Sequence, residues 1–178
     1  TQEDLIPVII AYLEKLASDE EKAGSMRKRQ SFVLGDFVRI PLTDGSYGYG
    51  RVVSRPYMAF YKYRTTEPSS DIDVIETQPL LFTQAVRILA QDRWVVIGNK
   101  ALEGEVARPV VGFMQDLADF RKCTIFDSAG MKRPATPEEC IGLERAAVWE
   151  SYGIAQRLLD TFMGRPNEEE IRSRVRLE

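Results

Sequence analysis

The sequence predicts an α+β fold in which a strongly bent antiparallel sheet, or partial barrel, packs against a long C-terminal helix, with an N-terminal helix appended. Two observations lead to this prediction. Strand patterns gather between Gly35 and Phe126, and a helical pattern follows from Pro137. Strands and helices do not alternate along the chain, as they would in a doubly wound parallel sheet.

The chain of 178 residues is expected to divide into three parts. These are an N-terminal helix and basic linker (residues 1–30), the α+β domain (residues 31–164) and a charged C-terminal tail (residues 165–178). A chain of this length buries about 70% of its unfolded surface, which is enough for a core without disulfides. The net charge of −3 is too small to imply electrostatic steering of any partner, and nucleic-acid binding would have to come from a local basic patch.

Absent and rare residue types exclude several kinds of site. The chain has no histidine, which rules out triads, acid–base catalysis and metal sites that depend on that residue. Its two cysteines, Cys123 and Cys140, make neither a zinc set nor a disulfide framework, and we expect buried thiols in a reducing compartment. No apolar run is long enough to span a membrane and there is no signal segment, although the start at Thr1 leaves open whether preceding residues were removed.

The first residues predict a helix. Thr1–Asp4 resembles a capping box, and apolar residues then recur at helical spacing until the polar run Ser18–Lys22. The basic cluster Arg27–Arg29 follows. We interpret this cluster as a solvated linker that is attracted to an acidic surface rather than as a nucleic-acid contact.

The chain is organised around Gly35–Arg64, which predicts three strands. Side chains alternate with a period near two on both sides of Asp44-Gly45, a pair suited to a hairpin turn. On the second strand large residues alternate with Gly48 and Gly50, so one face is nearly bare. Two glycines at this spacing indicate a bend or the close approach of another part of the chain.

Tyrosines mark one face of the third predicted strand, Tyr57–Tyr63. Tyr57, Tyr61 and Tyr63 lie on the same side of that strand. Such a face can line a core or contact another protein, because tyrosine combines a large apolar area with a hydroxyl. Core or barrel rim is the preferred interpretation.

The next segment, Thr65–Gln78, carries four carboxylates and no basic residue. The four are Glu67, Asp71, Asp73 and Glu76. A short strand would place Asp71 and Asp73 on one exposed face, where they could bind a divalent cation or act as acid and base. A solvated acidic strand edge is the preferred interpretation, and a negative surface for a basic partner ranks above metal binding.

Three further strands are expected before the C-terminal helix: Leu80–Val86, Trp94–Gly98 and Cys123–Phe126. Trp94–Gly98 has the β-rich composition of a central strand, and Trp94 is expected in the core. Phe113–Phe120 is ambiguous and is interpreted as a short helical turn with Phe113, Leu117 and Phe120 inward. Asp127–Gly130 is expected to reverse the last strand.

The strongest helix start in the chain lies at Thr136–Glu139, a capping box with Pro137 at the first helical position. Apolar residues then recur at helical spacing as far as Gly164, roughly 27 residues that would extend about 40 Å. Glycines in this stretch predict a break near Ser151–Gly153. The alternating acids and bases after Asn167 fit either a second short helix or a frayed tail.

Several short motifs resemble the immunity protein 26 family. The family's opening motif is similar to Gly35-Asp36, Ile40–Leu42, Gly45 and Tyr47–Val52, its second motif to Trp94, Ile97-Gly98 and Leu102, and its closing helix to Leu143-Glu144 and Val148-Trp149. The resemblance runs from Gly35 to Gly164 and omits the N-terminal helix. Members are small cytoplasmic proteins encoded beside polymorphic toxins, which they bind and neutralise.

The resemblance implies a cytoplasmic bacterial immunity protein that binds the C-terminal domain of a cognate polymorphic or contact-dependent toxin and blocks it. It implies no enzymatic activity and no cofactor. Composition, apolar run lengths and net charge lead us to expect no metal, no membrane association and no nucleic-acid partner. The residues expected to face the toxin are Tyr57, Tyr61, Tyr63, Glu67, Asp71, Asp73 and Glu76. The identity of the toxin and the oligomeric state are left open.

Two other functions stay open. Gly35–Arg39 followed by Gly50–Val52 is also similar to the start of SH3-like barrel modules, which bind RNA or peptides. Such a module would need exposed aromatic residues and clustered bases on one face. An enzyme using carboxylates, tyrosine or Cys123 is the third function, and it is disfavoured because no histidine is available to activate the thiol.

Overall fold

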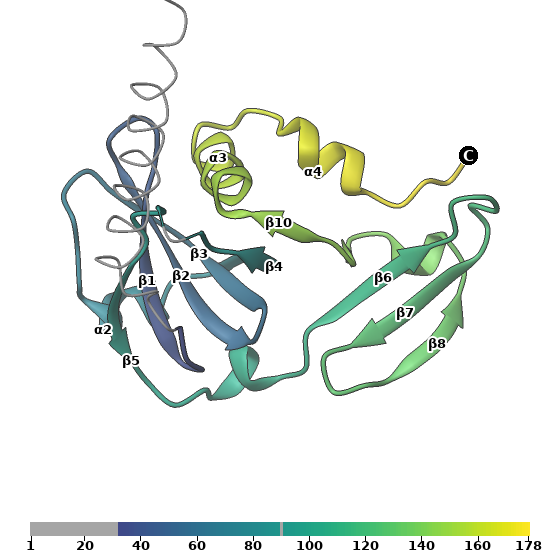
Figure 1. Ribbon diagram of the computed structural model, residues 1–178, viewed down its shortest axis with the longest axis horizontal. Helices are drawn as coiled ribbons and strands as arrows, with labels where there is room; N and C mark the ends of the chain where they lie inside the picture. Colours follow the sequence, from purple (N-terminus) through teal and green to yellow (C-terminus); the bar gives the residue numbers. More distant parts are fainter. Residues whose placement is uncertain (1–31, 90) are drawn as a thin grey trace, which may run out of the picture. The chain divides into compact units, whose positions relative to one another are not determined.

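A computed structural model describes residues 32–89 and 91–178, and these residues fold mainly into two β-sheets (Figure 1). The strands are β1 (Asp36–Pro41), β2 (Tyr47–Ser54), β3 (Tyr57–Thr65), β4 (Leu80–Arg87), β5 (Val95–Asn99), β6 (Val111–Gln115), β7 (Cys123–Asp127), β8 (Lys132–Ala135), β9 (Glu144–Arg145) and β10 (Val148–Glu150). The helices are α2 (Ile72–Glu76), α3 (Ser151–Phe162) and α4 (Glu168–Ser173), with 3₁₀ turns η1 (Gly104–Ala107) and η2 (Glu138–Cys140).

This architecture corrects the predicted α+β fold class. A six-stranded and a four-stranded sheet replace the single bent sheet or partial barrel, and the described residues contain three short helices instead of a long C-terminal one. The predicted N-terminal helix and basic linker lie outside the described residues. None of the helices within residues 32–89 and 91–178 has the length and apolar character needed to cross a membrane.

The first sheet has the strand order β10-β4-β3-β2-β1-β5, and its pairs are antiparallel except for β10 with β4. The predicted hairpin is confirmed: Phe37 lies opposite Arg51, and Gly45 takes a φ of 83° in the connecting turn. The prediction of a central strand at Trp94–Gly98 is wrong, because β5 is at the edge of this sheet. Trp94 is buried, as predicted.

The second sheet has the order β8-β7-β6-β9, with β9 parallel to β6. The strand at Cys123–Phe126 and the turn after it are confirmed. The helical turn predicted over Phe113–Phe120 is wrong. Phe113 lies in β6, where it pairs with Ile125 of β7 and is fully buried. Leu117, in contrast, is 96% exposed in the following loop. Strand alternation, and not helical spacing, therefore decides which residues of this segment point inward.

The predicted long helix does not form, because the backbone between the capping box and Ser151 adopts other conformations. The predicted capping box does form, because the Thr136 N–H donates to Glu139 at 2.8 Å and the Glu139 N–H donates to the Thr136 hydroxyl at 3.4 Å. It caps only η2, since Gly142 then adopts a φ of 81°. Val148–Glu150 pairs with β4 as a parallel strand, and backbone groups used in that ladder cannot also form a helix. A helix resumes at Ser151, close to the predicted break.

Both faces of the first sheet are covered. On one face Ile154 and Leu158 of α3 pack over a cluster that includes Val38, Phe60 and Trp149. The opposite face buries a second cluster, formed by Phe37, Tyr49, Tyr61 and Ile75 of α2. The alternation of side chains along β1 and β2 produces this division.

The bare face of β2 allows close packing. A Cβ atom on Gly50 would lie 3.0 Å from the Phe60 ring and 3.2 Å from the Ala59 carbonyl oxygen. A Cβ atom on Gly48 would lie 3.1 Å from a methyl group of Leu158 on α3. Close approach, and not positive φ, is therefore what these two positions require.

The predicted charged tail forms the short helix α4, capped by Asn167, and then packs on the second sheet. Arg145 donates to the carbonyl oxygens of Ser173 and Arg174 at 2.9 and 3.0 Å. Gln115 exchanges two hydrogen bonds with the backbone of Arg176, at 2.7 and 3.0 Å. These contacts anchor the last residues instead of leaving a frayed end.

Candidate functional site

The acidic segment lies between β3 and β4 and includes α2. The strand expected for Asp71 and Asp73 is wrong, because Ile72–Glu76 is helical. Asp71 caps this helix, and its carboxylate accepts a hydrogen bond from the Val74 N–H at 3.1 Å. Asp73 and Glu76 lie on the helix itself, while Glu67 is exposed in the preceding loop.

The acidic charge is partly compensated by a residue distant in sequence. Lys100, directly after β5, forms ion pairs with both Asp73 and Glu76. These hydrogen bonds raise the pKa of Lys100. The negative charge left without an ion pair is therefore smaller than the four carboxylates of the segment suggest.

The three tyrosines expected to contact the toxin are not equivalent. Tyr61 is 2% exposed and belongs to the core of the first sheet. Tyr63 is half-buried against the same cluster, with its ring centroid 5.2 Å from that of Tyr49. Tyr57 is half-buried at the opposite end of β3. The structure thus brings Tyr61 and Tyr63 toward α2 and separates Tyr57 from them.

Tyr49, which the sequence analysis did not select, organises the acidic loop. Its hydroxyl lies 2.6 Å from the Thr65 hydroxyl and accepts a hydrogen bond from the Ser69 N–H at 3.0 Å. Arg39 donates to the Ser69 carbonyl oxygen at 3.3 Å. The loop before α2 is therefore fixed to the sheet at two points. The alternation of Tyr47 and Tyr49 with glycines was the sequence signal that could have indicated a role for Tyr49 in holding this loop.

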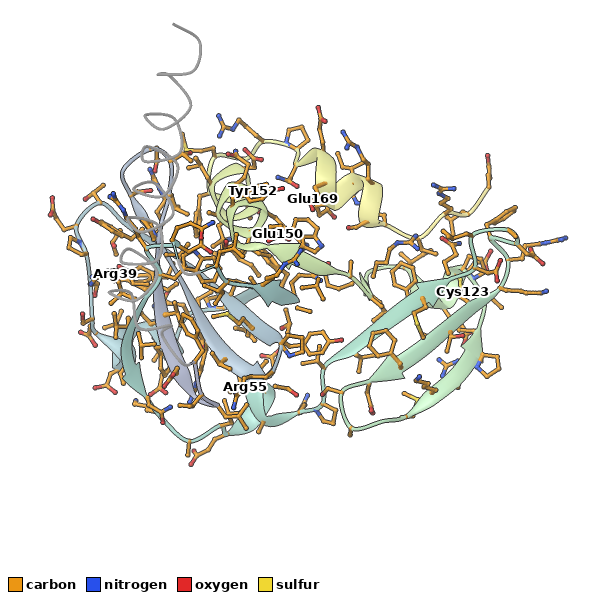
Figure 2. All side chains as sticks on the ribbon, viewed as in Figure 1. Arg39, Arg55, Cys123, Glu150, Tyr152 and Glu169 are labelled. Atoms are coloured by element: carbon orange, nitrogen blue, oxygen red, sulfur yellow. The ribbon has the colours of Figure 1, made fainter. Side chains whose placement is uncertain are left out.

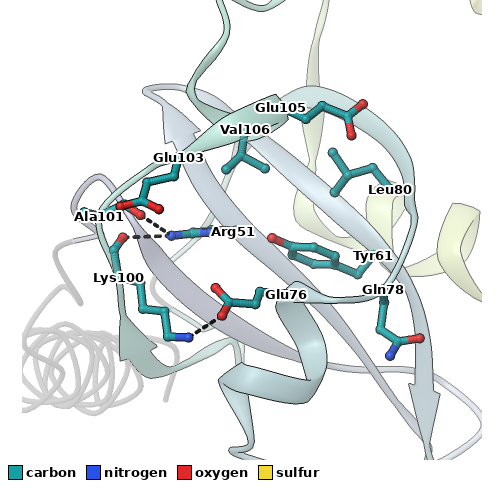
Figure 3. Close-up of a pocket in the computed structure, with 10 residues that line it drawn as sticks. All are labelled: Arg51, Tyr61, Glu76, Gln78, Leu80, Lys100, Ala101, Glu103, Glu105 and Val106. Carbon is teal, nitrogen blue, oxygen red and sulfur yellow. Dashed lines mark hydrogen bonds and ion pairs between the residues drawn. The ribbon is translucent and has the colours of Figure 1, made fainter.

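A pocket of about 500 Å³ opens beside the acidic segment (Figure 3). Its lining residues come from β2, β3, the α2 region, the start of β4 and the segment that follows β5: Arg51, Tyr61, Glu76, Gln78, Leu80, Lys100, Ala101, Glu103, Glu105 and Val106. Arg51 and Tyr61 are buried, whereas Glu103 and Glu105 are exposed. Figure 3 shows the Tyr61 hydroxyl pointing toward Arg51, with Glu76 on one side of them and Glu103 on the other.

The charges at the pocket affect the phenol. Burial raises the pKa of Tyr61, while the neighbouring Arg51 guanidinium lowers it.

Glu103 and Glu105 extend the acidic surface beyond the segment selected from sequence. Two strands, β4 and β5, separate them from Glu76 along the chain, so sequence proximity did not join them to it.

The cysteines are buried free thiols, as predicted. Cys123 lies on β7 in the second sheet (Figure 2), and Cys140 lies in the adjacent turn η2. Burial and the nearby Cys123 raise the pKa of Cys140 to about 11, which keeps its thiol neutral. Within residues 32–89 and 91–178, no three carboxylate or thiol side chains gather in a way that would hold a metal ion.

The family model described as immunity protein 26 matches residues 33–124, about half of the chain. The chain belongs to the immunity protein 26 family. Comparison with curated proteins and with solved structures gives no significant match. The predicted family is thereby confirmed, and the protein is an immunity protein of a toxin system.

The match to immunity protein 26 spans the whole candidate site. It includes the acidic segment, the three tyrosines and every residue that lines the pocket. It ends at residue 124, before the residues expected to resemble the family's closing helix. In the structure Glu144 and Val148-Trp149 form strands β9 and β10, so that expected helix is absent there.

Proposed function

We propose that this immunity protein binds the C-terminal domain of its cognate polymorphic or contact-dependent toxin in the cytoplasm and neutralises it by covering the toxin's functional surface. Membership of the immunity protein 26 family is the observation that carries the proposal. Binding alone accounts for such a role, because a few large side chains and a complementary charge patch suffice for a tight complex. The proposed action needs no catalysis and no cofactor.

The acidic surface beside the pocket is the proposed contact for a basic toxin domain. Glu67 on the β3–α2 loop, Glu103 at the start of η1 and Glu105 within η1 are exposed. Their side chains form no ion pair with any described residue, in contrast to Asp73 and Glu76. Unpaired surface carboxylates raise the rate at which a basic partner associates.

The tyrosines have different proposed roles. Tyr57 and Tyr63 are half-buried, so their accessible parts can contribute to a toxin contact. Tyr61 is buried, so it can contribute to binding only at the pocket that it lines, where its hydroxyl faces Arg51. Asp71 supports the surface by capping α2.

Surface plasmon resonance with the toxin domain encoded beside this chain tests the proposal. The variant Glu67→Lys/Glu103→Lys reverses two charges that form no ion pair within the described residues. We expect slower association at low salt and a smaller difference from wild type at high salt, because salt screens exposed charges.

The matched control is Glu138→Lys, which reverses an exposed charge next to the second sheet. It should associate as fast as the wild type. Identical association rates for all three proteins would place the toxin contact on another surface, and the absence of binding by the wild type would contradict the proposed function.

A further inference from the structure

The pocket has hydrogen-bond donors in its floor and acceptors at its mouth. Arg51 and Tyr61, 3% and 2% exposed, form the floor. Glu103 and Glu105 are exposed at the mouth, and Leu80 and Val106 provide apolar wall between the two levels. The pocket therefore suits a ligand that is polar at both ends.

The guanidinium of Arg51 is incompletely satisfied. Its Nη2 donates to the carbonyl oxygens of Lys100 and Ala101, at 2.9 Å each, and it stacks on the ring of Phe37 at 4.4 Å. Its Nε has no hydrogen-bond partner among the described residues, and none of their carboxylates forms an ion pair with it. A buried donor without an acceptor is unfavourable, so an oxygen atom that reached this group would be stabilised.

We propose that the pocket receives a loop of the toxin, with a lysine or arginine side chain between Glu103 and Glu105 and a backbone carbonyl oxygen of the same loop directed to Arg51. This inference rests on the proposed function and names the part of the surface that would determine specificity. Arg51 already binds two carbonyl oxygens, so a third oxygen of the same kind matches its chemistry.

The charges favour a basic side chain over an acidic one at the mouth. The lining contains two cations, Arg51 and Lys100, and three carboxylates, so the negative charge is in excess. Lys100 is engaged with Asp73 and Glu76, which leaves Glu103 and Glu105 as the unpaired charges. The aliphatic stem of a lysine or arginine would contact Leu80 and Val106 while its charged end stayed at the mouth.

A steric variant tests whether the pocket is used. Ala101→Trp places a large side chain at the pocket wall and keeps the backbone carbonyl that Arg51 binds. We expect the Kd for the inactive toxin domain to rise at least about tenfold, since hot-spot contacts lie in filled pockets. Ala129→Trp, in the exposed β7–β8 turn, is the matched control and should bind as the wild type does.

A charge variant tests the chemistry without a change of size. Glu103→Gln/Glu105→Gln should weaken binding about tenfold or more, whereas Glu138→Gln should not. Tighter binding by the double variant would show that an anionic group enters, and it would overturn the proposal. The double variant keeps the test valid if Ala101→Trp does not fold, which thermal melts of each variant would reveal.

Different results would contradict the proposed function and the pocket proposal. A wild-type protein that does not bind the toxin domain contradicts the proposed function, and the pocket proposal with it. A wild type that binds, with an unchanged Kd for folded Ala101→Trp and for the glutamine variant, overturns the pocket proposal alone.

Discussion

The guanidinium of Arg157 holds both carboxylate oxygens of Glu144, with nitrogen–oxygen distances of 2.6 and 3.1 Å. Arg157 belongs to α3, which packs on the first sheet, and Glu144 belongs to β9 of the second sheet. The same guanidinium lies 3.8 Å from the ring centre of Phe82 and 5.1 Å from that of Trp149. This pair, in which Arg157 is buried and Glu144 half-buried, joins the two sheets.

Breaking that pair should destabilise the protein. Glu144→Gln leaves the buried Arg157 charge without its counter-charge, which should cost roughly 1–3 kcal/mol because Glu144 is partly exposed to solvent. Urea unfolding monitored by tryptophan fluorescence measures the loss. The control is Glu168→Gln, which removes an exposed pair with Arg172 on α4 and should cost less than about 1 kcal/mol. Equal losses in the two variants would show that the Arg157 pair contributes no more than a surface contact.

The glycines of β2 should tolerate substitution unequally. Gly50→Val should lower the free energy of unfolding by more than about 1 kcal/mol, because the new side chain meets the Ala59 backbone and the buried Phe60 ring. Gly48→Ala meets only the end of the Leu158 side chain, which can move, so its cost should be smaller. Thermal melts measure both. An unchanged melting temperature for Gly50→Val would remove the requirement for close approach at that position.

Asp44 should make the protein sensitive to acid. Hydrogen bonds from the Ser46 hydroxyl and N–H, together with Arg64 at 2.6 Å, lower the pKa of Asp44 to about 2. Because the folded-state pKa lies below the ordinary value of 3.8, this stabilisation is present above about pH 4 and is lost as the pH falls through 2. Urea midpoints measured from pH 5 to pH 2 should fall less steeply for Asp44→Asn than for the wild type.

The causes of that shift can be separated. The side-chain hydrogen bond from Ser46 is the largest cause, so Ser46→Ala should remove more of the pH dependence than Arg64→Gln. The reverse order would mean that the ion pair dominates.

The two thiols should be unreactive in the folded protein. Cys140, with its pKa raised to about 11 by burial, and the buried Cys123 should not react with Ellman's reagent at pH 8 until denaturant is added. Since the folded-state pKa of Cys140 is raised, the neutral thiol stabilises the fold below pH 9, and this contribution is lost as the pH rises through 11. Rapid modification of the native protein would contradict this account of Cys140.

Part of the candidate site could be predicted from sequence. Glu67 and its neighbouring carboxylates stand out by composition alone, and three of them, Asp71, Asp73 and Glu76, lie at the cap of α2 or on that helix. Their partners could not be predicted. Lys100 is 27 residues from Asp73 and 24 from Glu76, and Arg51 is 49 residues from the Lys100 carbonyl oxygen that it binds. Sheet pairing brings these residues together, and no local pattern encodes it.

The sequence by itself determined the features that depend on neighbouring residues: the Asp44-Gly45 turn, the alternation along β1–β3, the capping box at Thr136 and the helix stop at Gly164. These features follow from backbone preferences within a few residues. Only the tertiary structure decided the fate of Val148–Glu150. The residues between the capping box and α3 have helical spacing, yet β4 offers their backbone a strand partner 63 residues away in sequence. The hydrogen bonds of that parallel ladder, with Trp149 buried in the core, outweigh local helix propensity, which is worth less than about 1 kcal/mol per residue.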